Sequence, residues 1–440
     1  MKKNVFLLLL LAVSLTLAGK EPKYIFLFIG DGMATPQRMI ADEFSRKTGK
    51  GQLVINTLPF HATTRTSSAN NLVTDSAAAA TAIACGTKTN NGMLGVDPAQ
   101  KRLTSVAEEA RDKGRKVGIV TSVTLNHATP AGFYGHRKSR SQAYDLGLDL
   151  VASHFDFFAG GGISKHDRGP KSIYDLAKEA GYTITSGREE MKALKPGKKA
   201  IAIAASRSSA MPYDIDRDPS CPSLAEMTEK AIEMLSNSPK GFFLMVEGGS
   251  IDWAGHSNEA AANLFEVLAL DQAVKAAMKF YEKHPDETLI VVTGDHETGG
   301  MTMGFAGTGY AIYMERLALQ KHSSVKFHKL LAKALKAKPD MTFEEVKPLL
   351  AENYGFIFDS KEKHPMNITA KELQLLQDAF AAKKLPQTAN IIMSGKAGIG
   401  WTSGSHTALP VLTTAIGAGA ENFTGFIDNT DIAKKLKDLL

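Results

Sequence analysis

Acidic and histidine residues follow three apolar runs of the sequence, at the points where each run ends. The runs are residues 24–29, 242–246 and 289–293. The residues that follow them are Asp31, Glu247, Asp252, His256, Asp295 and His296. Because ligands of an open parallel sheet bind at the carboxyl ends of its strands, these loops are expected to converge in space. Burying several like charges together is costly without a compensating cation, so the pattern predicts a metal site.

Each segment taken alone also has a plainer explanation. The Gly-Asp-Gly sequence at residues 30–32 is typical of a turn. Asp252 and His256 lie four residues apart, which also fits a pair on one face of a helix. The recurrence of such residues after three separate runs favours the metal site. Carboxylates combined with imidazoles suit Zn²⁺, and sets made only of oxygen suit Mg²⁺.

Ser76 is the candidate nucleophile. It lies with Asp75 at the start of four consecutive alanines, a composition that strongly favours a helix. Either residue could simply cap that helix. A serine at a helix N-terminus also lies beside backbone N–H groups that attract an anion, and a nearby metal would lower the pKa of its hydroxyl.

Apolar runs alternate with amphipathic stretches from residue 24 onward. Further strand-like runs cover residues 116–121, 200–204 and 411–416, and helical stretches cover residues 104–113, 172–180, 224–236, 258–279 and 431–439. The runs are continuously apolar, as in strands buried on both faces of a parallel sheet. The alternation predicts an α/β fold, a doubly wound three-layer sandwich with a mostly parallel central sheet.

Residues from about 301 to 390 interrupt this alternation. They are rich in helix formers and lysine, with five lysines between residues 326 and 338, and strand signal is almost absent. We interpret the segment as a helical subdomain inserted into one large domain of residues 19–440. Its basic face is expected to be solvated. Nucleic-acid binding is not expected, because few aromatic residues are interleaved with the charge.

The first eighteen residues are predicted to be a secretory signal peptide. Lys2 and Lys3 precede an unbroken apolar run over residues 5–13, and Thr16 and Ala18 stand at the −3 and −1 positions of a cleavage site. The run is too short for a membrane anchor, and an uncleaved N-terminal helix is the alternative. The mature protein is therefore expected in the periplasm or secreted, with no membrane attachment.

Composition and cysteine content exclude several classes of protein. The 440 residues are 43% hydrophobic and 22% charged, unlike a disordered or collagen-like chain. A net charge of +6 favours anionic partners only weakly. Cys85 and Cys221 are too few for a disulfide scaffold, and the sequence leaves open whether they pair.

Six motifs of the chain resemble those of the alkaline phosphatases in order and spacing. They are Gly30-Asp31-Gly32-Met33, Asp75-Ser76-Ala77, His127-Ala128-Thr129-Pro130, Glu247-Gly248-Gly249-Ser250-Ile251-Asp252, Asp295-His296 and Ser403-Gly404-Ser405-His406-Thr407. The motifs span most of the mature chain, and the Asp-Ser-Ala sequence followed by alanines is the most specific. The resemblance implies the fold of that family, hydrolysis of phosphate monoesters and a homodimer.

The resemblance also implies two zinc ions and one magnesium ion per chain. The implied ligands of the first zinc are Asp252, His256 and His406, those of the second are Asp31, Asp295 and His296, and those of magnesium are Asp31, Thr129 and Glu247. Arg140 matches the family's phosphate-binding arginine, and a surface arginine is the alternative. His127, Trp253 and Asp75 are expected near the site without binding a metal.

The implied mechanism has two steps. Ser76 would attack phosphorus to form a phosphoserine, and water would then release phosphate. Three divalent ions exceed the charge of four carboxylates, so the site would prefer the dianion of a monoester over the monoanion of a diester. Arg140 would bind two phosphoryl oxygens, and activity should rise toward alkaline pH.

Three other classes fit the sequence less well. A sulfatase needs a modified nucleophile in a Cys/Ser-x-Pro-x-Arg context, whereas alanines follow Ser76. A phosphodiesterase of the same superfamily would tolerate the loss of Thr129, Glu247 and Arg140, which are all present. A non-catalytic module that binds metal or phosphate would have no need of the serine. The physiological substrate is left undefined.

Overall fold

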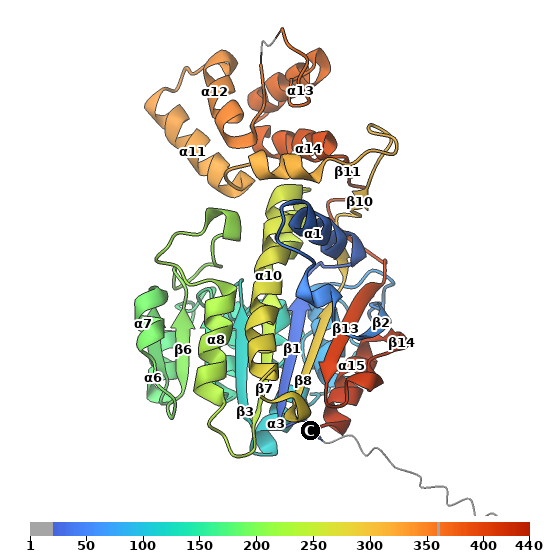
Figure 1. Cartoon of the computed structure of the whole chain (residues 1–440). Coiled ribbons are helices and arrows are strands. Elements are labelled where there is room, and N and C mark those ends of the chain that lie inside the picture. Colours follow the sequence, from blue (N-terminus) through green and yellow to red (C-terminus); the bar gives the residue numbers. More distant parts are fainter. Residues whose placement is uncertain (1–20, 359–360) are drawn as a thin grey trace, which may run out of the picture.

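A ten-stranded sheet, in the order β14-β2-β13-β8-β1-β7-β3-β4-β6-β5, forms the centre of the computed structural model, which describes residues 21–358 and 361–440 (Figure 1). Its strands are β1 (Tyr24–Gly30), β2 (Phe60–Arg65), β3 (Lys116–Thr121), β4 (Phe157–Gly160), β5 (Thr183–Ser186), β6 (Ala200–Ile203), β7 (Phe242–Gly248), β8 (Thr288–Gly294), β13 (Val411–Gly417) and β14 (Gly425–Asp428). Neighbouring strands are parallel except at β13, which runs antiparallel to β8 and β2. The predicted signal peptide at residues 1–18 lies outside the described residues.

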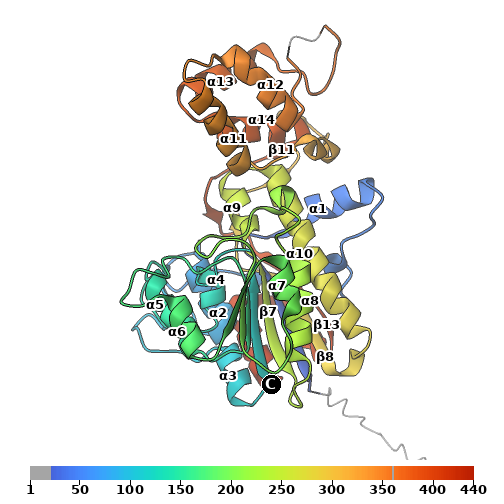
Figure 2. The ribbon, with the colours of Figure 1, turned by 90° about the vertical axis from the view of Figure 1, so that its left-hand side faces the viewer.

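Helices cover both faces of the sheet, which confirms the predicted α/β sandwich. Figure 2 shows α2 to α6 on one side of the sheet and α7, α8 and α10 on the other. The α-helices of the described chain are α1 (Thr35–Lys47), α2 (Ser76–Cys85), α3 (Val106–Asp112), α4 (Ala128–Ala131), α5 (Ala143–Ala152), α6 (Ile173–Glu179), α7 (Gly187–Ala193), α8 (Leu224–Leu235), α9 (Ser250–His256), α10 (Ala260–Tyr281), α11 (Ser324–Ala337), α12 (Phe343–Tyr354), α13 (Ala370–Ala381), α14 (Leu385–Ala397) and α15 (Asn429–Asp438). Among the described residues, we find no helix with the length and apolar character needed to cross a bilayer.

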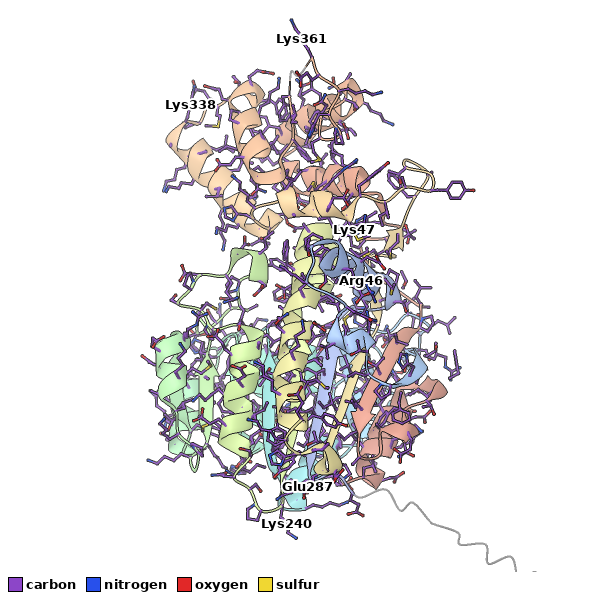
Figure 3. All side chains as sticks on the ribbon, in the orientation of Figure 1. Arg46, Lys47, Lys240, Glu287, Lys338 and Lys361 are labelled. Atoms are coloured by element: carbon purple, nitrogen blue, oxygen red, sulfur yellow. The ribbon has the colours of Figure 1, made fainter. Side chains whose placement is uncertain are left out.

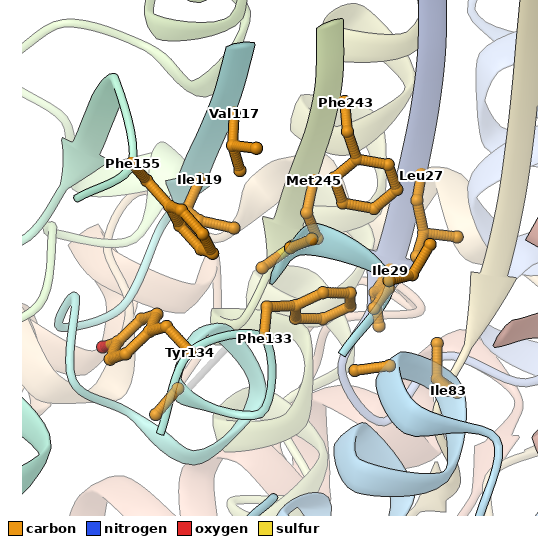
Figure 4. Packing of buried hydrophobic residues seen from close by; sticks show 14 of the residues in the cluster. Leu27, Ile29, Ile83, Val117, Ile119, Phe133, Tyr134, Phe155, Phe243 and Met245 are labelled. Carbon is orange, nitrogen blue, oxygen red and sulfur yellow. The ribbon is translucent and has the colours of Figure 1, made fainter. Parts of the chain in front are cut away.

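The central strands are apolar on both faces because each face supports its own hydrophobic cluster. In β1, Leu27 and Ile29 face one cluster, whereas Phe26 and Phe28 face the other. Figure 4 shows the first cluster, where Leu27 and Ile29 lie with residues of β3, β7 and α2. Successive side chains of a strand point to opposite faces, so a continuous apolar run is required here.

The strand over residues 411–416 runs opposite to the direction that a parallel sheet implies. It follows the short strand β12 (His406–Thr407), which pairs with β9 (Glu297–Thr298) just beyond the end of β8. The chain therefore enters β13 from the carboxyl edge of the sheet and has to run antiparallel to β8. Four further strands of four to six residues each were not predicted from the sequence: β2, β4, β5 and β14.

Helices α11 to α14 lie together above the carboxyl edge of the sheet (Figures 1 and 2). The chain enters and leaves this region through one antiparallel strand pair, β10 (Thr302–Met303) with β11 (Ile399–Gly400). Its core includes Phe327 and Leu350, together with Ile40 and Phe44 of α1. Lys338 and Lys361 mark its outer surface in Figure 3. The helices extend to Ala397, and their status as an inserted subdomain stays a prediction.

The two cysteines are free and buried on opposite faces of the sheet. Cys85 packs in the cluster with Leu27, and Cys221 packs in the cluster with Phe26. The sheet separates them, so no disulfide joins them.

We expect the Phe243→Ala substitution to lower the free energy of unfolding by about 3–5 kcal/mol, because it leaves a cavity in a central strand. Phe243 is fully buried in β7 and packs against Phe133. The exposed Phe426 provides the matched control, and Phe426→Ala should change stability by about 0.5 kcal/mol or less. Denaturant unfolding of both variants measures the difference. Equal denaturant midpoints for Phe243→Ala and Phe426→Ala would contradict the packing described here.

Candidate active site

The acidic loops predicted from the sequence meet at the carboxyl edge of three adjacent strands. β1 lies between β7 and β8, and Gly30 is in register with Gly248 and Gly294. The loop after β1 then turns at Gly32, whose φ of +74° favours glycine. A Cβ atom on Gly32 would lie 2.8 Å from the Cα of Asp252. The glycine therefore allows the Asp31 loop to approach the start of α9.

The first donor set contains Asp252, His256 and His406, whose candidate ligand atoms all lie within 4.8 Å of one another. Asp252 and His256 lie one turn apart on α9, and β12 supplies His406. The Nε2 atoms of the two histidines are 3.2 Å apart, and each is 3.4 Å from an oxygen of Asp252. Their Nδ1 atoms bind the carbonyls of Gly404 and Thr74, each at 2.8 Å, which orients both Nε2 atoms inward.

The second donor set contains Asp31, Asp295 and His296, which are fully buried. Nε2 of His296 lies 3.4 Å from a carboxylate oxygen of each aspartate. The other oxygen of Asp295 accepts hydrogen bonds from the backbone N–H groups of Gly32 and His296, at 3.0 and 2.9 Å. The hydroxyl of Ser76 lies 3.2 Å from Nε2 of His296. The candidate nucleophile thus contacts this donor set.

Ser76 is the first residue of α2, which is buried along its whole length. Asp75 caps the helix by accepting a hydrogen bond from the N–H of Ala78 at 3.0 Å. The guanidinium of Arg140 reaches this position: Nη1 lies 3.2 Å from the Asp75 carboxylate, and Nη2 lies 3.2 Å from Nε2 of His127. The guanidinium of Arg140 therefore contacts the residue that precedes the candidate nucleophile, and it is not an isolated group on the surface.

The third donor set contains Asp31, Glu247 and His127. Thr129 is also present, because its hydroxyl donates to Asp31 at 3.2 Å. From the sequence, His127 is expected near the site without binding a metal, whereas the structure brings one of its ring nitrogens within 4.8 Å of the two carboxylates. Trp253 lies beside it, with ring centroids 5.9 Å apart and ring planes at 83°.

Residues 22–440 match the sequence pattern of the alkaline phosphatases. Alkaline phosphatase 3 of Bacillus subtilis is 34% identical to the chain over 431 residues, which are 94% of this chain and 88% of that protein. The chain belongs to the alkaline phosphatase family. Repressible alkaline phosphatase of Saccharomyces cerevisiae is 31% identical and covers 96% of this chain and 82% of its own.

Solved alkaline phosphatases share the fold. The cold-active alkaline phosphatase of the psychrophile Shewanella sp. superimposes with a TM-score of 0.83 at 29% identity, and covers 95% of this chain and 99% of its own. The Thermus thermophilus alkaline phosphatase gives a TM-score of 0.82 at 26% identity, with coverages of 96% and 92%. These similarities confirm the predicted fold and the predicted activity, hydrolysis of phosphate monoesters by a metal-dependent enzyme.

The donor sets of this alkaline phosphatase fit cations. Burial raises the pKa of Glu247 to about 8 and that of Asp295 to about 7, and nearby carboxylates contribute to both shifts. The pKa of Asp31 is also raised by burial and by the neighbouring carboxylates. One buried oxygen of each of these three residues has no hydrogen-bond partner. Buried carboxylates that resist ionisation and have unpartnered oxygens fit the role of donors to a cation.

Three residues that support the donor sets were not predicted from the sequence. The hydroxyl of Thr298 donates to Asp252 at 2.5 Å, and that of Thr121 donates to Glu247. Buried Glu297 accepts hydrogen bonds from Gln37 and from Thr407, and so joins the strand after His296 to the strand that carries His406. Glu297 directly follows Asp295-His296 in the sequence. Its supporting role depends on Gln37 and Thr407, which only the fold brings next to it.

We expect Zn²⁺ binding to release protons at pH 7 and to strengthen as pH rises. The raised pKa values of Glu247, about 8, and Asp295, about 7, favour protonation of these carboxylates near neutral pH, and a hydrogen bond to Asp252 raises the pKa of His256 to about 9. A cation has to displace those protons, so its affinity should fall as pH decreases from 8 to 6. Calorimetric titrations in two buffers with different ionisation enthalpies measure the release. Equal apparent enthalpies in both buffers would contradict the proposed donor sets.

Proposed function

We propose that this alkaline phosphatase hydrolyses phosphate monoesters through a phosphoserine formed on Ser76. The observation that supports it most directly is the position of the Ser76 hydroxyl, which is buried at the start of α2 and 3.2 Å from Nε2 of His296. Next to it, Arg140 supplies a guanidinium that can bind two phosphoryl oxygens. A nucleophile, a donor set and an anion-binding group thus share one site.

We assign two zinc ions and one magnesium ion to the three donor sets. The sets that contain histidine pairs or a histidine with two aspartates suit zinc, and the oxygen-rich set of Asp31, Glu247 and Thr129 suits magnesium. When bound, these cations stabilise negative charge on the phosphoryl oxygens and lower the pKa of attacking hydroxyl groups. His127 contributes a ring nitrogen at the third set.

A relative supports magnesium at such a set. In a solved variant of the alkaline phosphatase from the Antarctic bacterium TAB5, an aspartate replaces a histidine and magnesium occupies the site called M3. That enzyme is 26% identical to this chain, with a TM-score of 0.69. In this chain, the ring nitrogen of His127 lies at the third donor set, so the identity of residue 127 would tune how tightly the chain holds magnesium.

Ser76, Asp75 and Arg140 have different roles in the proposed reaction. Ser76 Oγ attacks phosphorus, so that a new P–O bond forms on the enzyme while the P–O bond to the alcohol breaks, and the proton lost by the serine is balanced by the one gained by the departing alcohol. Asp75 orients Arg140, whose guanidinium keeps the phosphoryl group in place through both steps. Water then attacks the phosphoserine, releases inorganic phosphate and restores the Ser76 hydroxyl.

Export and dimer formation complete the proposal. Lys2, Lys3 and the apolar run that follows support cleavage after residue 18 and release to the periplasm or the medium. The family resemblance supports a homodimer. Small phosphate monoesters are the proposed substrates, without a role for nucleic acid or membrane.

Ser76→Ala should reduce kcat for a simple aryl phosphate by on the order of 10³-fold or more, because it removes the attacking oxygen. Metal content, measured by elemental analysis, should stay at the level of the unmodified enzyme.

Thr81 provides the matched control, since it is a buried hydroxyl residue of the same helix that bonds only to backbone groups. Thr81→Ala should therefore retain kcat within about tenfold. Near-normal turnover by Ser76→Ala would overturn the phosphoserine mechanism.

A further inference from the structure

A cavity of about 910 Å³ lies between the sheet domain and helix α11. Trp253 and His127 line it beside the donor sets, and serines of the loop after β6 line it further out. Lys326 and Lys329, near the start of α11, line it from the helical region. Figure 1 shows this end of α11 directed down toward the body of the enzyme.

We propose that this cavity is a subsite for the alcohol part of the substrate. It favours phosphate monoesters whose alcohol carries an aromatic ring and a second phosphate group, as nucleoside bisphosphates do. The inference rests on the proposed function and defines a substrate class for the same site.

The cavity borders the candidate active site through His127 and Trp253, which line it. Arg140 contacts Asp75, next to Ser76, with one nitrogen and His127 with the other, each at 3.2 Å. His127 in turn packs edge-to-face with Trp253. A substrate whose phosphoryl group is bound by Arg140 would have His127 and Trp253 on one side, and a bulky alcohol directed to that side would extend into the cavity.

Trp253 provides a surface for a planar ring. It is half-buried, and it packs against Tyr213 and Ala254, which fix its position in the cavity wall. The loop after β6 is fixed as well, because the carbonyls of Arg207 and Ser209 accept hydrogen bonds from residues 163 and 162 at 2.9 and 2.8 Å. A rigid indole beside such hydroxyl-bearing residues suits an aromatic base joined to a sugar.

The charge of the cavity suits a second phosphate. Neither Lys326 nor Lys329 forms an ion pair with any residue that the structure describes. The acidic lining residue is Asp216, and it already accepts hydrogen bonds from the N–H and hydroxyl groups of Ser323. Residues 301–397 contain 14 Lys and Arg against 9 Asp and Glu, so this region carries five of the six net positive charges of the chain.

The test compares kcat/KM for ribose 5-phosphate, adenosine 5′-monophosphate and adenosine 3′,5′-bisphosphate on the metal-loaded enzyme. Lys326→Gln/Lys329→Gln should lower the ratio of bisphosphate to monophosphate by about three- to tenfold at low salt, and the effect should shrink at high salt. Lys333→Gln/Lys336→Gln, on exposed positions of the same helix, should leave this ratio unchanged.

The ring is tested by Trp253→Leu, which should lower the ratio of adenosine monophosphate to ribose 5-phosphate by roughly tenfold, whereas Trp253→Phe should keep most of it. Ratios taken within one variant cancel any loss of metal or of folded protein. An unchanged ratio in Lys326→Gln/Lys329→Gln, or an equal fall in the control pair, would overturn the subsite. Failure of the unmodified enzyme to hydrolyse all three monoesters would overturn the proposed function and the subsite with it.

Discussion

Mutual repulsion among buried carboxylates is the constraint on which this structure depends. Asp31, Glu247 and Asp295 are fully buried at one edge of the sheet, and Asp252 is only 4% exposed. No lysine or arginine of the described chain forms an ion pair with them, and three of their oxygens lack hydrogen-bond partners. Such a cluster is stable in its ionised form only when cations occupy it. We therefore expect metal binding and folding to be linked in this enzyme.

The same constraint explains why the chain cannot be divided between its first and last candidate ligands. Asp31 follows β1, whereas His406 lies in β12, more than 370 residues later. The pairing of β12 with β9 brings His406 to the carboxyl edge and forces β13 to run antiparallel. Helices α11 to α14 lie in the sequence between Asp31 and His406. They do not disturb the site, because the antiparallel pair β10–β11 brings the two ends of this region together. Bound cations would act as cross-links in a chain whose two cysteines are unpaired.

Local patterns of the sequence predicted the central strands and the candidate donor residues that follow them. His406 and Thr129 were assigned only through the resemblance to the family. Buried parallel strands need continuous apolar runs, and a charge at the end of such a run is conspicuous. The direction of β13 and the short strands β4 and β5 depend on contacts between distant segments, so no local pattern reveals them. The same reason hides the position of His127 at the third donor set and the hydrogen bond from Thr298 to Asp252. The cavity under α11 likewise exists only after the chain has folded.

Anomalous diffraction from crystals of the metal-loaded enzyme, recorded on both sides of the zinc absorption edge, tests the central claim most directly. We expect two zinc peaks, one at Asp252, His256 and His406 and one at Asp31, Asp295 and His296, with a lighter ion between Asp31 and Glu247. Occupied zinc peaks away from these carboxylates, or well-ordered carboxylates with no ion among them, would contradict the account.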